Sequence, residues 1–173
     1  GNFAAAHKEP TFTTLVHDLE HIDEVLHPKD ASIHQHEFPK AHDGHFVNPA
    51  RIAELQAVKS STFDLTKLIQ ICHELNNAHI SKSYISIIML TRGLIDHVPP
   101  LFGATSFAQV ASSYGGTKSF KDSMQHLDNS SRKIADQHLH SHIRKKEVLP
   151  NFTQVNFSND IDVLLAEIVR IVK

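Results

Sequence analysis

The chain has 173 residues, of which 40% are apolar, and this is enough for the core of one ordinary domain. A formal net charge of -2 excludes a protein whose whole surface is basic, so any contact with nucleic acid must come from a local patch or from an assembly. The single cysteine, Cys72, excludes a disulfide framework and a zinc site made of cysteines.

The sequence carries no sign of secretion or of a membrane anchor. No apolar run reaches the length of a membrane span, and no signal segment opens the chain. We therefore expect a cytoplasmic protein with no membrane contact. The chain begins with Gly1 and Asn2 rather than with methionine, and we expect it to be one domain of a longer protein.

Histidine is unusually frequent, with 15 residues in the chain. Because histidine titrates near pH 6.5, mild acidification would move the net charge from -2 toward about +13. Most of these histidines are expected to be exposed polar residues rather than ligands.

The first predicted helix covers residues 11–27, where apolar residues recur at helical spacing until Pro28 ends the pattern. Residues 28–48 lack a helical period and form the long loop of the chain, which holds four of the histidines. Within this loop, Ile33–Phe38 is the segment that could form a short strand. No alternating strand pattern is found elsewhere.

A short helix is predicted from Asn48 and Pro49 to about Lys59, because an asparagine N-cap followed by proline is a typical helix start. Residues 62–79 form the next predicted helix, with Cys72 on its apolar face.

Residues 82–97 are apolar nearly all round, which predicts a helix buried in the centre of the fold. Pro99 and Pro100 are expected to end this helix. A short helix at 105–113 and a turn made by two glycines should follow.

The segment 118–146 is predicted to be one long helix whose inward stripe begins apolar and becomes polar toward its C-terminal end. The stripe consists of Phe120, Met124, Leu127, Ser131, Ile134 or Ala135, and His138. The last helix is predicted over 158–172, with Ser158 as its N-cap and Arg170 in its last turn, as the helix dipole prefers. Its predicted core face consists of Ile161, Leu164, Leu165, Ile168, Ile171 and Val172.

These elements predict an all-α fold, an antiparallel bundle of four to five main helices. We divide the chain into an N-terminal part, 1–61, with a helix, the histidine-rich loop and a short helix, and a helical core, 62–173. The two parts are expected to form one compact domain overall.

The most unusual segment runs from Ser130 to Lys146 and gathers cations and proton carriers in a nearly neutral protein. It contains Arg132, His138, His140, His142, Arg144, Lys145 and Lys146, with Asp136 as its single acidic residue. The segment is interpreted as a solvated helix face, a metal site or a site for a phosphate-bearing substrate.

A metal site is the weakest of these interpretations. His138 and His142 lie four residues apart and would share one face of a continuous helix. Zinc needs three or four ligands, and the chain has no HExxH motif. The remaining zinc ligands would have to come from the loop, which would need to fold over to bring His34, His36, His42 and His45 close. We therefore expect no metal and no cofactor.

A phosphate site has stronger chemical support. Metal-free RNA cleavage needs a group that takes the proton from the ribose 2'-hydroxyl, a group that protonates the leaving oxygen, and a cation that stabilises charge on the phosphoryl oxygens. His138 and Arg132 suit these tasks. His142, Arg144, Lys145 and Lys146 would bind the RNA backbone.

Arg132 and His138, separated by five residues and followed by a spacer and a closing amphipathic helix, resemble the signature of the HEPN superfamily of helical domains. The resemblance covers residues 62–173. It implies a helical homodimer in which two protomers bring their Arg and His sets together. Many members of this superfamily are metal-independent endoribonucleases of toxin, phage-defence and RNA-processing systems, whereas others are inactive modules for dimerisation or nucleotide binding.

A second Arg-to-His pair, Arg92 and His97, stands at the end of the apolar segment 82–97. We expect Arg92 to pair with Asp96 at i+4, with a supporting role or an alternative catalytic role for Arg92, Asp96 and His97. Asp136 could likewise pair with Arg132, in which case the segment would be an exposed cationic helix end.

The sequence therefore predicts a metal-independent endoribonuclease or RNA-binding domain, with Arg132 and His138 as catalytic residues. The alternative is a non-catalytic homodimeric module for dimerisation or ligand sensing, attached to an effector domain. The two hypotheses differ in geometry. An enzyme needs Arg132 and His138 exposed and close together, within a protomer or across a dimer, whereas a module would hold them apart or pair them with intramolecular partners.

Overall fold

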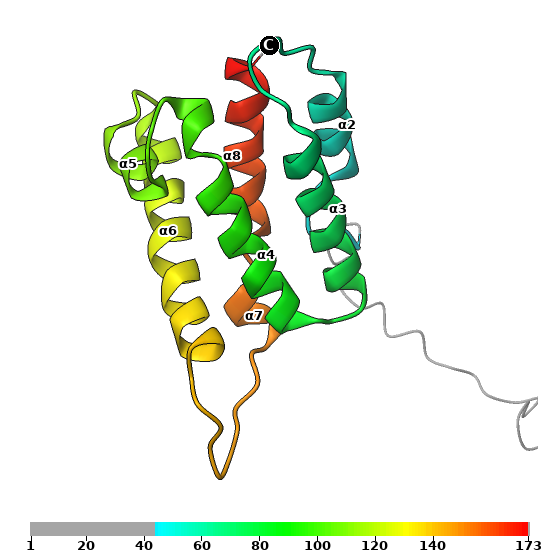
Figure 1. The fold of residues 1–173 in the computed structure, drawn as a ribbon, viewed down its shortest axis with the longest axis vertical. Helices are drawn as coiled ribbons and strands as arrows, with labels where there is room; N and C mark the ends of the chain where they lie inside the picture. The colour runs from blue at the N-terminus through cyan, green and yellow to red at the C-terminus, as the bar shows by residue number, and fades with distance from the viewer. Residues whose placement is uncertain (1–43, 173) are drawn as a thin grey trace, which may run out of the picture. The chain divides into compact units, whose positions relative to one another are not determined.

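The computed structural model of the chain describes residues 44–172, which contain helices and turns and no strand (Figure 1). The chain divides into two units, Gly1–Lys40 and Ala41–Lys173, and each described residue belongs to the second. The predicted helix 11–27 and the candidate strand Ile33–Phe38 lie outside the described residues. The all-α class is confirmed for the described part of the chain.

Helix α2, Pro49–Ala57, begins as the sequence predicts. The Asn48 side chain accepts a hydrogen bond from the Ala50 N–H at 2.9 Å, and proline occupies the first helical position. Ile52 and Leu55 of α2 are buried, and the helix packs against α3 and α8.

Helix α3, Thr66–Ile80, begins later than the predicted residue 62. The reason is local, because a helix that began at residue 62 would use the Thr66 N–H to bind the Thr62 carbonyl, and the Asp64 side chain takes this N–H instead. Ser60 Oγ accepts from the Phe63 N–H at 3.1 Å, and Asp64 accepts from the Thr66 N–H at 2.8 Å. Cys72 is fully buried on the inner face, and burial raises the pKa of its thiol to about 12. Its interpretation as a core residue is confirmed.

Helix α4, Tyr84–His97, packs against α3 and α6 and buries Ile87, Leu94 and Ile95. The prediction of burial all round is wrong for one face, because Ile85 is 45% exposed and Met89 is 57% exposed. Neither α3 nor α6 covers that face.

The segment Tyr84–Phe102 also corrects the statement that no run reaches membrane-spanning length. Its length and composition alone would permit a span, but the core helix of a soluble protein passes the same test. The segment is broken by a 3-10 turn, Pro99–Phe102, labelled η1. Within the bundle, 39% of this segment is buried, and its helical part packs against α3 and α6.

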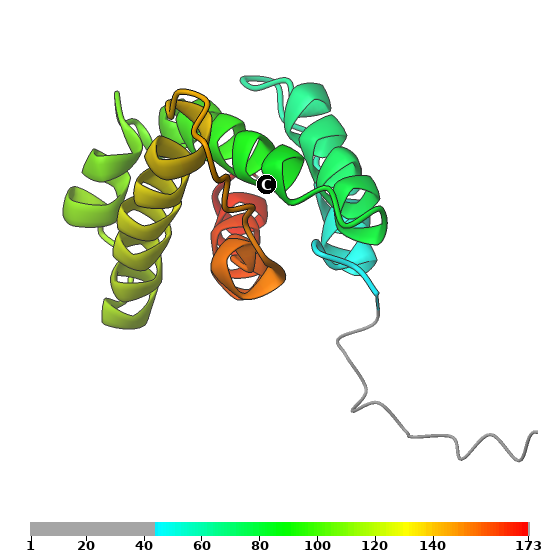
Figure 2. The ribbon, with the colours of Figure 1, turned by 90° about the horizontal axis from the view of Figure 1, so that it is seen from below.

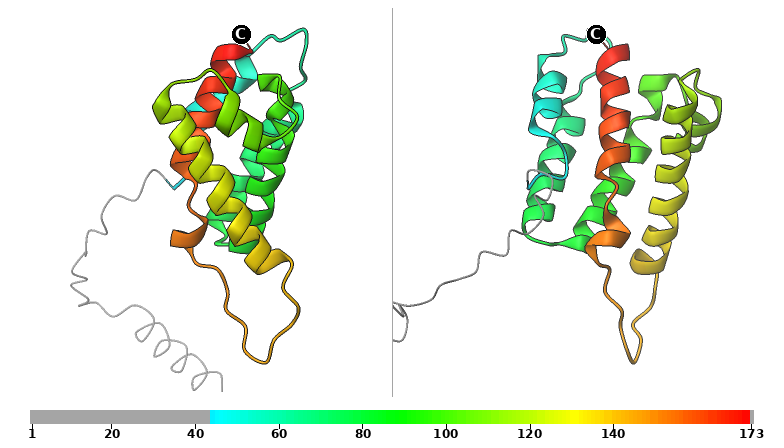
Figure 3. Two further views of the ribbon diagram at one scale, coloured as in Figure 1. Left: turned by 90° about the vertical axis from the view of Figure 1, so that its left-hand side faces the viewer. Right: turned by 180° about the vertical axis from the view of Figure 1, so that it is seen from behind.

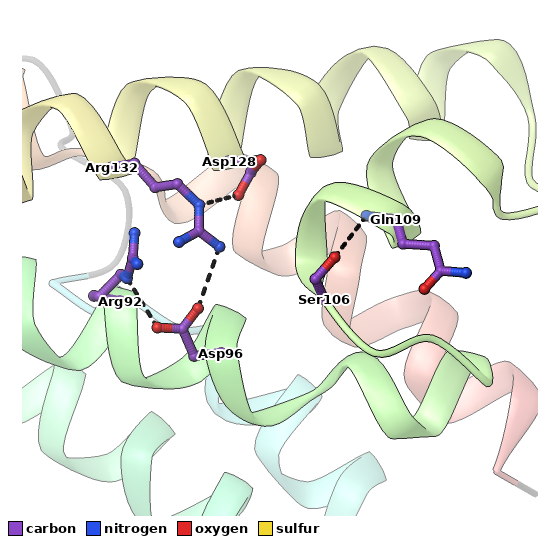
Figure 4. Close-up of polar contacts among 6 residues, drawn as sticks. All are labelled: Arg92, Asp96, Ser106, Gln109, Asp128 and Arg132. Carbon is purple, nitrogen blue, oxygen red and sulfur yellow. Dashed lines mark hydrogen bonds and ion pairs between the residues drawn. The ribbon is translucent and has the colours of Figure 1, made fainter.

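Helix α5, Phe107–Ser113, is capped by Ser106, whose hydroxyl accepts from the Gln109 N–H at 3.3 Å (Figure 4). Helix α6, Lys118–Leu139, follows after the glycine turn and buries Phe120, Met124 and Leu127.

Helix α6 ends at Leu139 and not at the predicted residue 146. Residues 141–149 are all exposed, so no apolar side chain of this stretch holds a further turn against the core. They form a connection that projects beyond the ends of the helices (Figure 1). We call residues 140–149 the α6–α7 loop.

The chain returns through α7, Phe152–Val155, into α8, Ser158–Ile171. The predicted N-cap of α8 is wrong by one residue, because Phe157 is the N-cap. Ser158 instead donates both its N–H and its hydroxyl to the Asn156 side chain, the hydroxyl at 2.7 Å. The core face of α8 is confirmed, with Leu164, Leu165 and Ile168 fully buried.

The long helices alternate in direction. Helix α4 runs antiparallel to α3 and to α6, and α8 runs antiparallel to α6 (Figures 2 and 3). Helix α8 packs on α6 and on α2, which closes the bundle. This arrangement places α6 beside α4, and these two helices carry the two Arg-to-His pairs of the sequence.

Candidate functional site

Arg132 is held by two carboxylates. It lies on α6 with its side chain 30% exposed. Its Nε donates to Asp128 of the preceding turn at 2.5 Å, and one terminal nitrogen donates to Asp96 of α4 at 3.2 Å. Figure 4 shows the guanidinium lying between the two acidic side chains. The predicted exposed arginine therefore forms an ion-pair bridge between two helices.

Arg92 joins the same bridge. Its Nε donates to the other oxygen of Asp96 at 2.8 Å, which confirms the predicted pair at i+4. Arg92, Asp96, Asp128 and Arg132 thus form one network of two cations and two anions, which we call the charged network. The arginines of the two motifs, which the sequence offered as alternatives, meet at one carboxylate (Figure 4).

The surroundings of Arg132 stabilise its charge. Partial burial lowers the pKa of the guanidinium, but the hydrogen bond and charge of Asp128, followed by those of Asp96, outweigh this effect and raise the pKa. The charge of Arg132 is therefore already balanced inside the protomer.

Asp136 does not form the ion pair with Arg132 that the sequence suggested. Asp128 and Asp136 stand at equal spacing on either side of Arg132, and the structure pairs Arg132 with Asp128. Asp136 is exposed. Asp128, which is only 8% exposed, is the residue that the sequence analysis missed. The sequence signal that could have identified Asp128 is its distance of four residues from Arg132, the same distance that pointed to Asp136.

His138 lies in the last turn of α6. Its Nε2 is buried and has no hydrogen-bond partner among the described residues. An ideal helix turns residues six positions apart by about 120° about its axis, so Arg132 and His138 leave α6 in different directions. Within residues 44–172, neither side chain is hydrogen-bonded to the other.

The predicted backbone-binding residues, His142, Arg144, Lys145 and Lys146, all lie exposed in the α6–α7 loop. Since α6 ends at Leu139, they do not continue the helix that carries Arg132 and His138.

The loss of helix also separates His138 from His142 as a helical ligand pair. Within residues 44–172, no three His, Cys, Asp or Glu side chains are grouped so that they could hold a metal ion.

His97 is separate from the charged network. It stands in the last turn of α4, where burial, and next the charge of Lys67 on α3, lower the pKa of its imidazole. His97 thus lies near α3, whereas the neighbouring Asp96 binds α6. The second Arg-to-His pair does not assemble a common site in the described protomer.

Comparison with protein-family models, with curated proteins and with solved structures found no match to this chain.

Proposed function

We propose that residues 44–172 form a non-catalytic helical module that acts by dimerisation. The observation that carries this proposal is the pairing of Arg132 with Asp128 and Asp96. A guanidinium stabilises a phosphorane only if its donors and its charge face the phosphoryl oxygens. Here two carboxylates bind its Nε and one of its two terminal nitrogens, and their negative charges would repel an approaching phosphate.

An exposed apolar surface supports the dimer. Ile85 and Met89 lie one turn apart on the uncovered face of α4, so they are neighbours on its surface. Leu149, which is 73% exposed, lines a groove together with Ile85. A second copy of the chain that covers Ile85, Met89 and Leu149 would remove these aliphatic side chains from water.

The second candidate is the HEPN-like metal-independent endoribonuclease. His138 favours it, because a buried imidazole nitrogen without a partner among the described residues is available for proton transfer. The exposed cations of the α6–α7 loop would bind the RNA backbone. For this function Arg132 would have to leave Asp128 and Asp96, or a second protomer would have to complete the site.

RNA cleavage distinguishes the two candidates. We expect the purified chain to leave end-labelled single-stranded RNA intact in excess EDTA, because the charge of Arg132 is neutralised. Arg132→Ala and His138→Ala should behave like the parent protein, with circular dichroism as the check that each variant is folded. Cleavage by the parent protein that both variants lose would overturn the proposal and establish the endoribonuclease.

The dimer is tested by mass measurement. We expect the chain to elute as a dimer in size-exclusion chromatography with light scattering, and Met89→Lys to shift it to the monomer, because a lysine charge buried in an apolar interface is costly. Val163→Lys is the matched control, since Val163 is an exposed valine on α8. A monomeric parent protein, or equal dissociation by both variants, would contradict the proposed surface.

A further inference from the structure

A cavity of about 630 Å³ lies where α3 ends and α4 begins, and none of its lining residues belongs to the charged network. The sequence analysis did not single it out. Its lining is mostly apolar, and Phe46, Ile80 and Phe152 belong to it. This size and character are typical of a site for a small organic molecule.

The cavity has an aromatic wall with histidine in its middle. The ring of His79 lies 5.8 Å from that of Phe46 and 5.3 Å from that of Phe152, measured between centroids. Burial, and next the charge of His45, lower the pKa of His79. Nδ1 of His79 is buried and has no hydrogen-bond partner among the described residues. A polar atom left in this state is the group that a bound ligand would satisfy.

The ionisable side chains that line the cavity favour negative charge. They are His45, His79, Lys82 and Tyr84, and no Asp or Glu belongs to the described lining. Aromatic rings, one lysine, side chains that donate hydrogen bonds and the absence of a carboxylate from this lining together select an apolar molecule that carries an anionic group.

Lys82 occupies a backbone position that normally takes glycine. Its φ is 54°, and it closes α3 with two hydrogen bonds, from the Lys82 N–H to the His79 carbonyl at 3.0 Å and from the Ser83 N–H to the Ala78 carbonyl at 2.8 Å. In this motif glycine costs least, whereas a lysine in the left-handed region costs about 1 kcal/mol. An unfavourable backbone conformation that places a cation at a cavity points to function.

We propose that this cavity binds a small organic anion, an aromatic carboxylate whose apolar body packs against Phe46, Ile80 and Phe152. Lys82 pairs with the carboxylate, and the imidazole N–H groups of His45 and His79 donate hydrogen bonds to it. This inference rests on the proposed function in one respect: ligand sensing would be one of the roles of the proposed module. Binding itself requires neither dimerisation nor the absence of RNA cleavage, so the two proposals fail independently.

The test is an NMR titration of the ¹⁵N-labelled full chain with 2-naphthoate and, as its uncharged counterpart, 2-naphthamide. We expect saturable shifts of the backbone signals of Phe46, His79, Lys82 and Phe152 with 2-naphthoate. The affinity for 2-naphthamide should be about tenfold lower, as expected for the loss of a charged hydrogen bond. Absence of saturable shifts, shifts confined to other residues, or equal affinity for both compounds would overturn the proposal.

Two variants assign the ends of the ligand. Lys82→Asn removes the charge and keeps the turn, because asparagine adopts the left-handed conformation more readily than lysine. It should weaken 2-naphthoate about tenfold and leave 2-naphthamide unchanged, whereas Lys133→Asn on the exposed surface of α6 should affect neither. Phe152→Ala, at a residue that is 40% exposed, should weaken both compounds. Equal binding of 2-naphthoate by Lys82→Asn and Lys133→Asn would overturn the anionic end of the proposal.

Discussion

Asp128→Ala is expected to lower the free energy of unfolding by about 2 kcal/mol, whereas Asp136→Ala should change it by less than about 0.5 kcal/mol. Removal of Asp128 leaves the half-buried guanidinium of Arg132 without its shorter ion pair. The expected loss of unfolding free energy is smaller than the roughly 3–5 kcal/mol typical of a fully buried ion pair. The reason is that the Arg132 side chain is 30% exposed, so water partly solvates the guanidinium when Asp128 is removed.

The comparison with Asp136 makes this test specific. Both aspartates stand four residues from Arg132 on α6, so both changes remove the same group at the same spacing. Urea denaturation followed by circular dichroism gives the two free energies. A double-mutant cycle of Asp128→Ala with Arg132→Met should show coupling, because the two residues are in contact. Equal losses for the two aspartates, or additivity in the cycle, would contradict the charged network.

Asn76→Ala is expected to destabilise the fold by about 2 to 3 kcal/mol. The Asn76 side chain, 8% exposed on α3, accepts from the Val47 N–H at 2.7 Å and donates to the Val47 carbonyl at 2.9 Å. Val47 is 1% exposed, so neither backbone group can turn to water when the amide is removed. Both would remain buried and unpaired.

Asn77 supplies the matched control. It is the same residue type at the next position of α3, but it is exposed. Asn77→Ala should leave the stability within about 0.5 kcal/mol of the parent protein, since alanine also favours a helix. Thermal or urea unfolding of the three proteins decides the question. A similar cost for Asn76→Ala and Asn77→Ala would refute the stabilising role of the two hydrogen bonds between Asn76 and Val47.

The local rules of helix formation predicted much of the fold. The start of α2 followed from Asn48 and Pro49, because a cap is a contact between near neighbours in the chain. The core face of α8 followed from its apolar period. The Arg92–Asp96 pair followed from a spacing of four. Each of these features depends on residues within a few positions of one another.

The features that the sequence did not give depend on neighbours from other helices. Ile85 and Met89 look as buried as Ile87 in the sequence, and only the placement of α3 and α6 leaves them exposed. The end of α6 depends on whether other parts of the core pack against residues beyond Leu139. The pattern of apolar residues along α6 alone cannot reveal this.

The candidate site shows the same limit. Spacing allowed Arg132 to pair with Asp128 or Asp136, and nothing in the chain order of α6 distinguishes them. Asp96 of α4 approaches the same guanidinium from 36 residues away, and this contact could not be read from the sequence. The spacing of Arg132 and His138 suggested a shared site, whereas the fold assigns Arg132 to an ion-pair bridge.

The exposed α6–α7 loop has a consequence for how the last part of the fold is retained. Its residues 141–149 are all exposed, and Arg144, Lys145 and Lys146 offer trypsin three consecutive cleavage sites. Helix α8 stays in place through its buried face, with Leu164, Leu165 and Ile168 packed in the core. The bundle can therefore be regarded as a long fragment and a short complementary peptide, held together by apolar packing across an interruption of the backbone.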